Sequence, residues 1–320
     1  MKKVILIPII LGSVLLIGGG VVFGLAIYKN ATGAKAASVT TPHDLSEKTF
    51  DKFQIDLKTA EFEVKMSDNG EKKVICEETN KNHHDVKVEN DTLYITQIDD
   101  TKWYEKIFNF NFEKIKVTVY VPAGEYDNMT IKSSTGSITI PNDFTFNTVS
   151  ATLSTGATEI KADVKDEIKV KASTGAVYLA DLSAKNTNVE CSTGGVKLDN
   201  VDVQEKIFVK VSTGNIKFNN VTAKDIETKS STGNVTYTST KATNSIVSKT
   251  STGDVKFEDS DAASLNIETD TGDVTGTLLT GKTFDCQSDT GKVKYPDSTI
   301  GAGLCKIRTD TGKIDIKVKA

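Results

Sequence analysis

The chain has 320 residues, of which 38% are hydrophobic and 26% are charged, and this composition is typical of a folded protein rather than a disordered one. Its formal net charge is -4, and Arg308 is the only arginine, so lysine carries the rest of the positive charge. Because bidentate recognition of phosphates and base edges depends largely on arginine, we expect no nucleic-acid partner.

The N-terminal segment is predicted to be a membrane anchor. Residues 4–27 contain no charged side chain, and a run of this length can cross a hydrocarbon core about 30 Å thick as a helix. The alternative is a secreted protein released by cleavage near Ala34-Lys35-Ala36, although the apolar part of a signal peptide is usually only about 7 to 15 residues long. We therefore expect a single-pass cell-membrane protein with a signal-anchor helix at 1–29 and an extracytoplasmic C-terminal domain.

The next part of the chain is predicted to contain a linker and then a β-rich region. Residues 30–49 are rich in Ala, Thr, Ser and Lys and have no apolar period, which indicates a linker. Alternation with period two follows and predicts strands in a capping region at 50–125, namely at 53–57, 62–66, 86–88, 93–95 and 115–121. The aromatic segment 103–112 is expected to form a short helix or an aromatic plug.

Residues 126–320 consist of a repeated unit. A Thr-Gly pair returns ten times at intervals of 19 to 21 residues. The glycines are predicted to occupy turns in which glycine tolerates a positive φ, and they are Gly136, Gly156, Gly175, Gly194, Gly214, Gly233, Gly253, Gly272, Gly291 and Gly312. The preceding threonines form a possible ladder of Thr135, Thr155, Thr174, Thr193, Thr213, Thr232, Thr252, Thr271, Thr290 and Thr311.

Apolar residues lie at fixed distances from each glycine. Around Gly214, Ile207 and Val209 lie seven and five residues before it, and Ile216 and Phe218 lie two and four after it. These positions are the inward sides of two short strands, and a third strand per unit is possible. One unit cannot bury its apolar face alone, whereas stacked units share a core. The fold class is therefore predicted to be all-β, a parallel β-solenoid of about ten coils behind the anchor and the capping region.

These residues resemble a known family. The matching motifs begin at Val117-Thr118-Val119-Tyr120-Val121-Pro122, continue through Met129-Thr130-Ile131-Lys132-Ser133-Ser134-Thr135-Gly136-Ser137-Ile138, and extend over the repeated S-x-G-x-V coils. These segments are similar to the putative-adhesin domain family of unknown function. That family consists of bacterial envelope β-solenoids and includes the membrane-anchored LiaG-type proteins of Gram-positive bacteria. The resemblance covers the chain from about residue 50 to the end. It implies a cell-envelope protein and provides no catalytic residue or cofactor.

Two enzyme classes are alternatives to that interpretation. Asp270, Asp289 and Asp310 each begin a D-T-G triplet, as in aspartic proteases, but they occupy a turn position that serine holds in the other repeats. A polysaccharide-active β-helix enzyme is the stronger alternative. Such sites need charged groups in a groove, usually between long loops, and the near-constant repeat spacing leaves no room for these loops.

The metal-binding and thiol residues were expected to be structural. Asp254 and Asp273 could form a carboxylate ladder attractive to calcium, but solvated charges on a turn explain them better, because Lys292 and Lys313 fill the same position in other repeats. His83 and His84 were interpreted as surface residues. No C-x-x-C spacing indicates zinc, so no metal or cofactor site and no disulfide framework is predicted for the cysteines, which are Cys76, Cys191, Cys286 and Cys305.

The predicted function is non-enzymatic adhesion or cell-envelope interaction, through an unidentified envelope, wall-polymer or protein ligand. A second alternative is that the threonine ladder binds a periodic ligand such as ice or a glycan. The last segment, 313–319, was expected to form an exposed edge strand guarded by lysines, which predicts a monomeric ectodomain.

Overall fold

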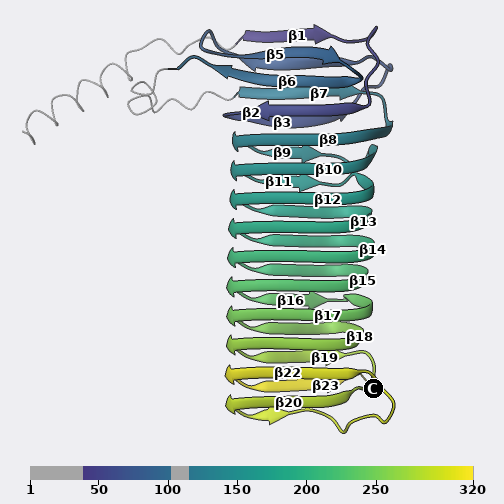
Figure 1. Ribbon diagram of the computed structural model, residues 1–320, viewed down its shortest axis with the longest axis vertical. Helices are drawn as coiled ribbons and strands as arrows, with labels where there is room; N and C mark the ends of the chain where they lie inside the picture. The colour runs from purple at the N-terminus through teal and green to yellow at the C-terminus, as the bar shows by residue number, and fades with distance from the viewer. Residues whose placement is uncertain (1–38, 102–114, 320) are drawn as a thin grey trace, which may run out of the picture.

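The computed structural model describes residues 39–101 and 115–319, and all of its regular elements are β-strands (Figure 1). The expected anchor at 1–29 and the aromatic segment 103–112 lie outside the described residues. Among those that are described, no helix is long and apolar enough to cross a membrane. The strands join into one 23-stranded sheet that coils into a rod.

Seven strands form the front of the rod. They are β1 (Val39–Asp44), β2 (Lys52–Leu57), β3 (Ala60–Met66), β4 (Lys73–Glu78), β5 (Asn82–Glu89), β6 (Thr92–Asp99) and β7 (Ile115–Val121). β2 and β3 lie parallel to the first two solenoid strands, β8 and β9, while β4 runs antiparallel to both β1 and β7, and β5 runs antiparallel to β6. The strands expected in 50–125 therefore do cap the first coil.

Strand β1 corrects the predicted linker at 30–49. It pairs along its whole length with β4, from Val39 opposite Glu78 to Asp44 opposite Lys73. Apolar periodicity could not reveal this strand because the side chains on its partly buried face, Thr41 and His43, are polar.

The solenoid is built from parallel strands stacked in register. They are β8 (Gly124–Thr135), β9 (Ile138–Ile140), β10 (Phe144–Thr155), β11 (Thr158–Ile160), β12 (Asp163–Thr174), β13 (Val177–Thr193), β14 (Val196–Thr213), β15 (Ile216–Thr232), β16 (Val235–Thr238), β17 (Lys241–Thr252), β18 (Val255–Thr271), β19 (Val274–Leu278), β20 (Thr283–Thr290), β21 (Val293–Lys294), β22 (Leu304–Thr311) and β23 (Ile314–Val318). The parallel β-solenoid of about ten turns is thus confirmed.

A typical coil has three straight segments. In β14, a corner at Asn200, which has φ 53°, separates Leu198 from Val201, and a register shift after Val203 marks the next bend. The same corner is held by Asp181, Asn220, Ser239 and Asp259 in other coils, all with φ between 48° and 52°. Asn and Asp tolerate this left-handed conformation better than most residues, which explains their recurrence there. The third strand per coil, which the sequence analysis gave as a possibility, is therefore present.

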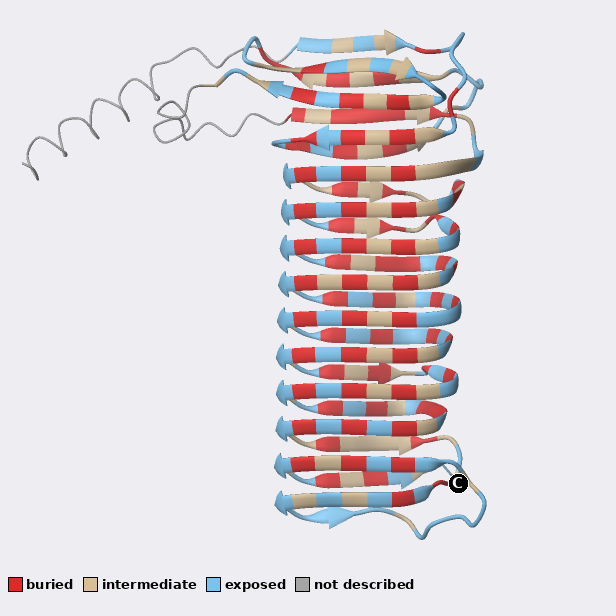
Figure 2. Cartoon of the chain, viewed as in Figure 1, coloured by how far each residue is buried: buried red, intermediate tan, exposed pale blue. Residues whose placement is uncertain are grey.

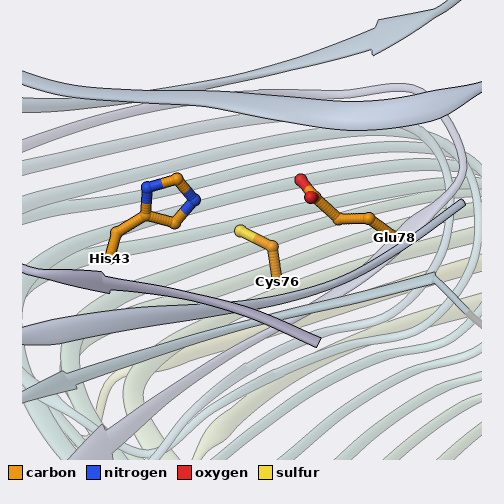
Figure 3. A group of neighbouring side chains, drawn as sticks. All are labelled: His43, Cys76 and Glu78. Carbon is orange, nitrogen blue, oxygen red and sulfur yellow. The ribbon is translucent and has the colours of Figure 1, made fainter. Parts of the chain in front are cut away.

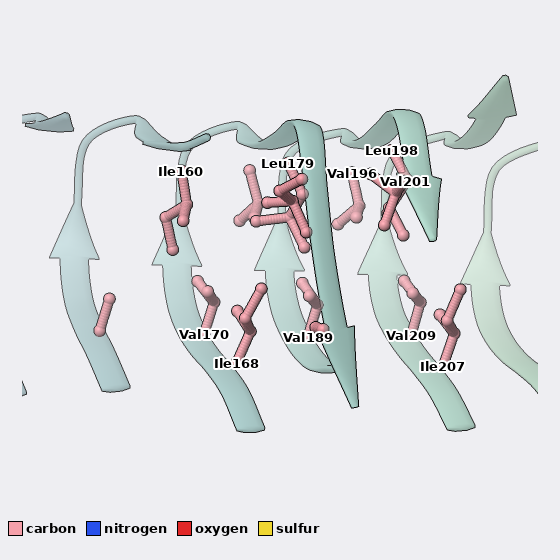
Figure 4. Packing of buried hydrophobic residues seen from close by; sticks show 14 of the residues in the cluster. Ile160, Ile168, Val170, Leu179, Val189, Val196, Leu198, Val201, Ile207 and Val209 are labelled. Atoms are coloured by element: carbon pink, nitrogen blue, oxygen red, sulfur yellow. The ribbon is translucent and has the colours of Figure 1, made fainter. Parts of the chain in front are cut away.

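Inward residues of successive coils pack in columns along the rod. Figure 2 shows buried and exposed residues alternating along the strands, and Figure 4 shows the interior columns, in which Val170, Val189 and Val209 follow one another in three successive coils. Larger side chains stack where the columns allow it. The rings of Phe218, Tyr237 and Phe257 lie nearly parallel, with centroids 5.0 and 4.9 Å apart.

The C-terminal end corrects a second prediction. β22 and β23 do not form the last coil, because β22 lies between β18 and β20, and β23 lies between β19 and β21 (Figure 1). In the sequence β20 and β21 come before β22 and β23, but in the rod they stack outside them, so β22 and β23 occupy the position next to β18 and β19. The segment 313–319 is therefore not the terminal strand, because β21 covers it at Ile314 and Asp315. β20 and β21 lie at the end of the rod, where Asp285, Asp289 and Lys294 face solvent.

Candidate functional site

Corner glycines bring adjacent coils into close contact. Gly214 has φ 140°, and a Cβ added there would lie 2.0 Å from the carbonyl oxygen of Gly194 in the preceding coil. Both the torsion and the contact therefore require glycine. Nine of the ten predicted glycines have φ between 139° and 156°, and the exception is Gly291 in the terminal coil.

The threonine ladder is continuous and exposed. Each threonine lies opposite its equivalent in the neighbouring coil, and at the rear the order is Thr271, Thr311 and then Thr290. Their backbone carbonyls accept hydrogen bonds from the corner glycines, such as Gly194 N–H to Thr213 O at 2.8 Å. Among the hydrogen bonds of the described residues, only Thr290 and Thr311 join their hydroxyls, at 3.3 Å. The ladder therefore offers hydroxyl groups to solvent.

In the later coils, the residue after each corner glycine joins adjacent coils by a hydrogen bond between its backbone N–H and a side chain. Asn234 N–H donates to the side chain of Asn215, Asp254 N–H donates to Asn234, and Asp273 N–H donates to Asp254, all at 2.8 to 2.9 Å. Lys313 N–H continues the series by donating to Asp273 at 2.9 Å. These bonds between coils give Asp254 and Asp273 a structural role.

A second outward column, which the sequence interpretation missed, lies four residues before each glycine. In spatial order its members are Lys132, Thr152, Lys171, Glu190, Lys210, Lys229, Lys249, Glu268, Arg308 and Gln287. Six are cations and two are anions. The repeat spacing could have revealed this bias, because the position is as regular as that of the threonines.

Shallow grooves follow this column along the rod. One is lined by Lys171, Glu190 and Lys210, the other by Lys210, Lys229 and Lys249, and serines two residues before the corner glycines line both. The two grooves meet at Lys210. A cationic and hydroxyl-lined groove of this form suits an extended polymer better than a small molecule, because it is open and has no deep cavity.

Ion pairs neutralise part of the column. Lys171 Nζ lies 3.2 Å from Glu190 Oε1, and Lys249 Nζ lies 2.9 Å from Glu268 Oε2. The hydrogen bond with Glu268 raises the pKa of Lys249. Such exposed pairs contribute little to stability and can open for a ligand. Within the described residues, Lys210 makes no ion pair, so its charge is available.

The acidic D-T-G residues lie together but on the surface. Asp270, Asp310 and Asp289 follow one another in the column that serine occupies elsewhere, and all three side chains are exposed. This is the turn position that the repeat predicted. His84, in contrast, was interpreted as a surface residue and is buried, with 6% of its surface exposed.

The fold and its outer columns define a capped β-solenoid with a repetitive surface. The chain belongs to the Toastrack DUF4097 family, whose model matches residues 50–207 and 202–320. No curated protein matches the chain.

Several solved structures are similar to the chain at low identity. A putative adhesin from Bacteroides fragilis is 18% identical with a TM-score of 0.45, covering 90% of this chain and 100% of that one. A putative lipid binding protein from Parabacteroides distasonis is 15% identical with a TM-score of 0.46, covering 88% and 98%. A putative cell adhesion protein from Clostridium sporogenes is 12% identical with a TM-score of 0.25, covering 88% and 100%. None of these three has a name that indicates an enzyme.

Proposed function

We propose that this protein is a non-enzymatic adhesion or cell-envelope interaction protein that binds an extended anionic polymer along its lysine column. The observation that supports this is the regular placement of Lys171, Lys210, Lys229 and Lys249 beside serine hydroxyls in grooves that run along the rod. Parallel strands are about 4.8 Å apart, so a polymer with closely spaced charges can engage several lysines at once.

The apolar segment 4–27 anchors the rod to the cell membrane, with the solenoid outside. A rigid rod of stacked coils then holds its binding columns away from the bilayer. In this arrangement the ligand is a polymer of the envelope or of a neighbouring surface, and binding depends on many weak contacts rather than one pocket.

The experiment compares polymers and charge reversals with the purified full-length chain in mild detergent. We expect binding to an anionic polyphosphodiester that weakens as salt is added, and little binding to a neutral glucan. The variant Lys210→Glu/Lys229→Glu should bind at least about tenfold more weakly, since each reversal replaces attraction with repulsion. Lys217→Glu is the matched control, because Lys217 is exposed on a different segment of the coil.

Two results would overturn the proposal. Equal binding of neutral and anionic polymers, unaffected by the double reversal, would remove the lysine column as the site. Release of reducing ends or phosphomonoesters from either polymer during incubation would show that the protein is an enzyme.

A second candidate is a periodic neutral ligand held by the exposed threonine ladder. The unbroken register of the ten threonines favours it. Thr193→Val/Thr213→Val removes two central hydroxyls with little change in shape, and unchanged glycan binding and ice recrystallisation in this variant would exclude the idea.

A further inference from the structure

The cap contains a cluster of side chains that the solenoid surface does not explain. β1 runs antiparallel to β4 with Thr41 opposite Cys76. Directly opposed residues in an antiparallel pair point to the same side of the sheet, as do residues two apart on one strand. His43, Cys76 and Glu78 therefore share one face. One nitrogen, the sulfur and one carboxylate oxygen all lie within 4.8 Å of one another.

Figure 3 shows how the three side chains meet. The imidazole of His43 and the carboxylate of Glu78 lie on either side of the Cys76 sulfur, and Nε2 of His43 faces this sulfur. That Nε2 atom is buried and has no hydrogen-bond partner. Cys76 itself is fully buried and Glu78 is 9% exposed. An imidazole nitrogen, a thiol and a carboxylate thus converge in a protected place.

Thr41 and His84 hold Glu78 in position. Thr41 Oγ1 donates to Glu78 Oε2 at 2.7 Å, the backbone N–H of His84 donates to Glu78 Oε1 at 2.6 Å, and Nδ1 of His84 lies 3.0 Å from the same oxygen. Because the carboxylate can only accept, Nδ1 of His84 carries the proton. Its Nε2 is also buried and has no hydrogen-bond partner.

Buried polar atoms without partners cost free energy, so Nε2 of His43, which faces a thiol and a carboxylate, needs an explanation. Their chemistry indicates one, since imidazole nitrogen, thiolate sulfur and carboxylate oxygen are the usual ligands of zinc. We propose that His43, Cys76 and Glu78 bind a divalent transition-metal ion of the zinc class, with His84 as a positioning residue for Glu78. Calcium and magnesium are excluded as the preferred ions because they favour oxygen ligands.

The geometry requires only a modest contraction. Bonds of about 2.0 to 2.3 Å in a tetrahedral site place ligand atoms about 3.5 Å apart, so the cluster must close by roughly 1 Å. Three protein ligands leave the fourth position to water. Because a metal binds the thiolate form of cysteine, Cys76 releases its proton to the solvent when the ion binds.

The bound ion would fasten the front end of the rod. β1 and β5 are outer strands, since among the described strands β1 pairs with β4 alone and β5 pairs with β6 alone. An ion held by β1 and β4, with His84 of β5 against Glu78, links these elements where the sheet has an open edge.

Cobalt titration of the reduced, chelator-treated full-length chain tests the proposal. We expect about one equivalent of Co²⁺ to bind with a thiolate-to-cobalt charge-transfer band in the near ultraviolet, and Zn²⁺ to displace it. Cys76→Ser should abolish the band, and His43→Gln should weaken binding at least about tenfold. His84→Gln should weaken binding by about 10- to 100-fold while leaving the band at its wild-type position, as expected of a residue that acts through Glu78.

Matched controls separate a lost ligand from a damaged fold. Cys191→Ser removes a buried thiol from the solenoid, and His83→Gln changes the neighbouring imidazole, so both should bind Co²⁺ as the wild type does. Zn²⁺ should raise the thermal midpoint of the wild type and both controls but not of Cys76→Ser. If Cys76→Ser does not fold, the partly exposed His43 still provides the test. Absence of Co²⁺ binding in the wild type, or binding that is unchanged in both Cys76→Ser and His43→Gln, overturns the proposal.

Discussion

Replacement of one corner glycine should unfold the solenoid far more readily than replacement of its neighbour. Gly194 has φ 141°, and a Cβ there would lie 1.8 Å from the carbonyl oxygen of Gly175. Gly195, the next residue, does not have a positive φ, and its Cβ would meet only the oxygen of Asn215 at an ordinary 3.6 Å. Gly194→Ala and Gly195→Ala thus add the same methyl group to the same corner.

The magnitude follows from the contacts at this corner. The left-handed torsion costs about 1 to 3 kcal/mol for alanine. Relief of the clash also strains the hydrogen bonds from Gly175 N–H to Thr193 O and from Val177 N–H to Gly195 O, both 2.9 Å, each worth about 1 kcal/mol. Gly194→Ala should therefore lose about 3 to 5 kcal/mol, whereas Gly195→Ala should change stability by less than about 1 kcal/mol.

Urea unfolding followed by circular dichroism would measure both variants. The denaturant slope must be compared as well, because a repeat protein can unfold in parts. Equal stability of the two variants would refute the claim that the corner contact demands glycine.

Three other changes test the interior. The Lys282 ammonium is almost fully buried and lies 2.7 Å from the Asp261 carboxylate, so Asp261→Asn leaves it without its acidic partner. Urea unfolding should show a loss of about 3 to 5 kcal/mol in stability, largely recovered when Lys282→Met is added. Phe218→Ala opens a gap beneath the aromatic stack and should lose about 3 to 5 kcal/mol by the same assay, and a loss below about 1 kcal/mol would mean that the column can collapse. Burial raises the pKa of Cys305 to about 12 and that of Cys286 to about 11. A thiol reagent at pH 8 should therefore react slowly with both thiols in the native chain and rapidly in urea. Fast reaction of Cys305 in the native chain would contradict its burial.

The repeated part of the fold was predictable because each unit carries the same local information. The inward positions around Gly214 and the corner torsion both follow from side-chain type and spacing, and the structure places Val209 and Phe218 inside as expected. The exposed column of Lys210 could have been found in the same way. It was overlooked because turns and apolar residues specify the architecture, whereas outward charges do not.

The order of the final coils could not be predicted from the same pattern. The units around Gly291 and Gly312 both satisfy the repeat, so nothing local indicates which of them stacks on Gly272. The structure places Gly312 against Gly272, with Gly291 outside it. The interval of 21 residues between the last two glycines, the longest of the series, is the only sign of the longer return path.

The cluster in the cap was hidden for a different reason. His43 lies on β1, whereas Cys76 and Glu78 lie on β4 much later in the chain, so no ligand spacing in the sequence connects His43 with the other two. The strand that carries His43 also lacks apolar alternation. Only the pairing of β1 with β4 brings these side chains together.

The most direct test of the proposed function is to change the number of coils. Residues 196–215 form one unit whose ends are in register with the next, since Val196 lies opposite Ile216, so this unit can be deleted or duplicated. If the lysine column binds an anionic polymer at many points, affinity and its dependence on salt should fall in the deletion variant and rise in the duplication variant. Affinity and salt dependence that stay the same in both variants would contradict a repetitive binding surface and indicate a single local site.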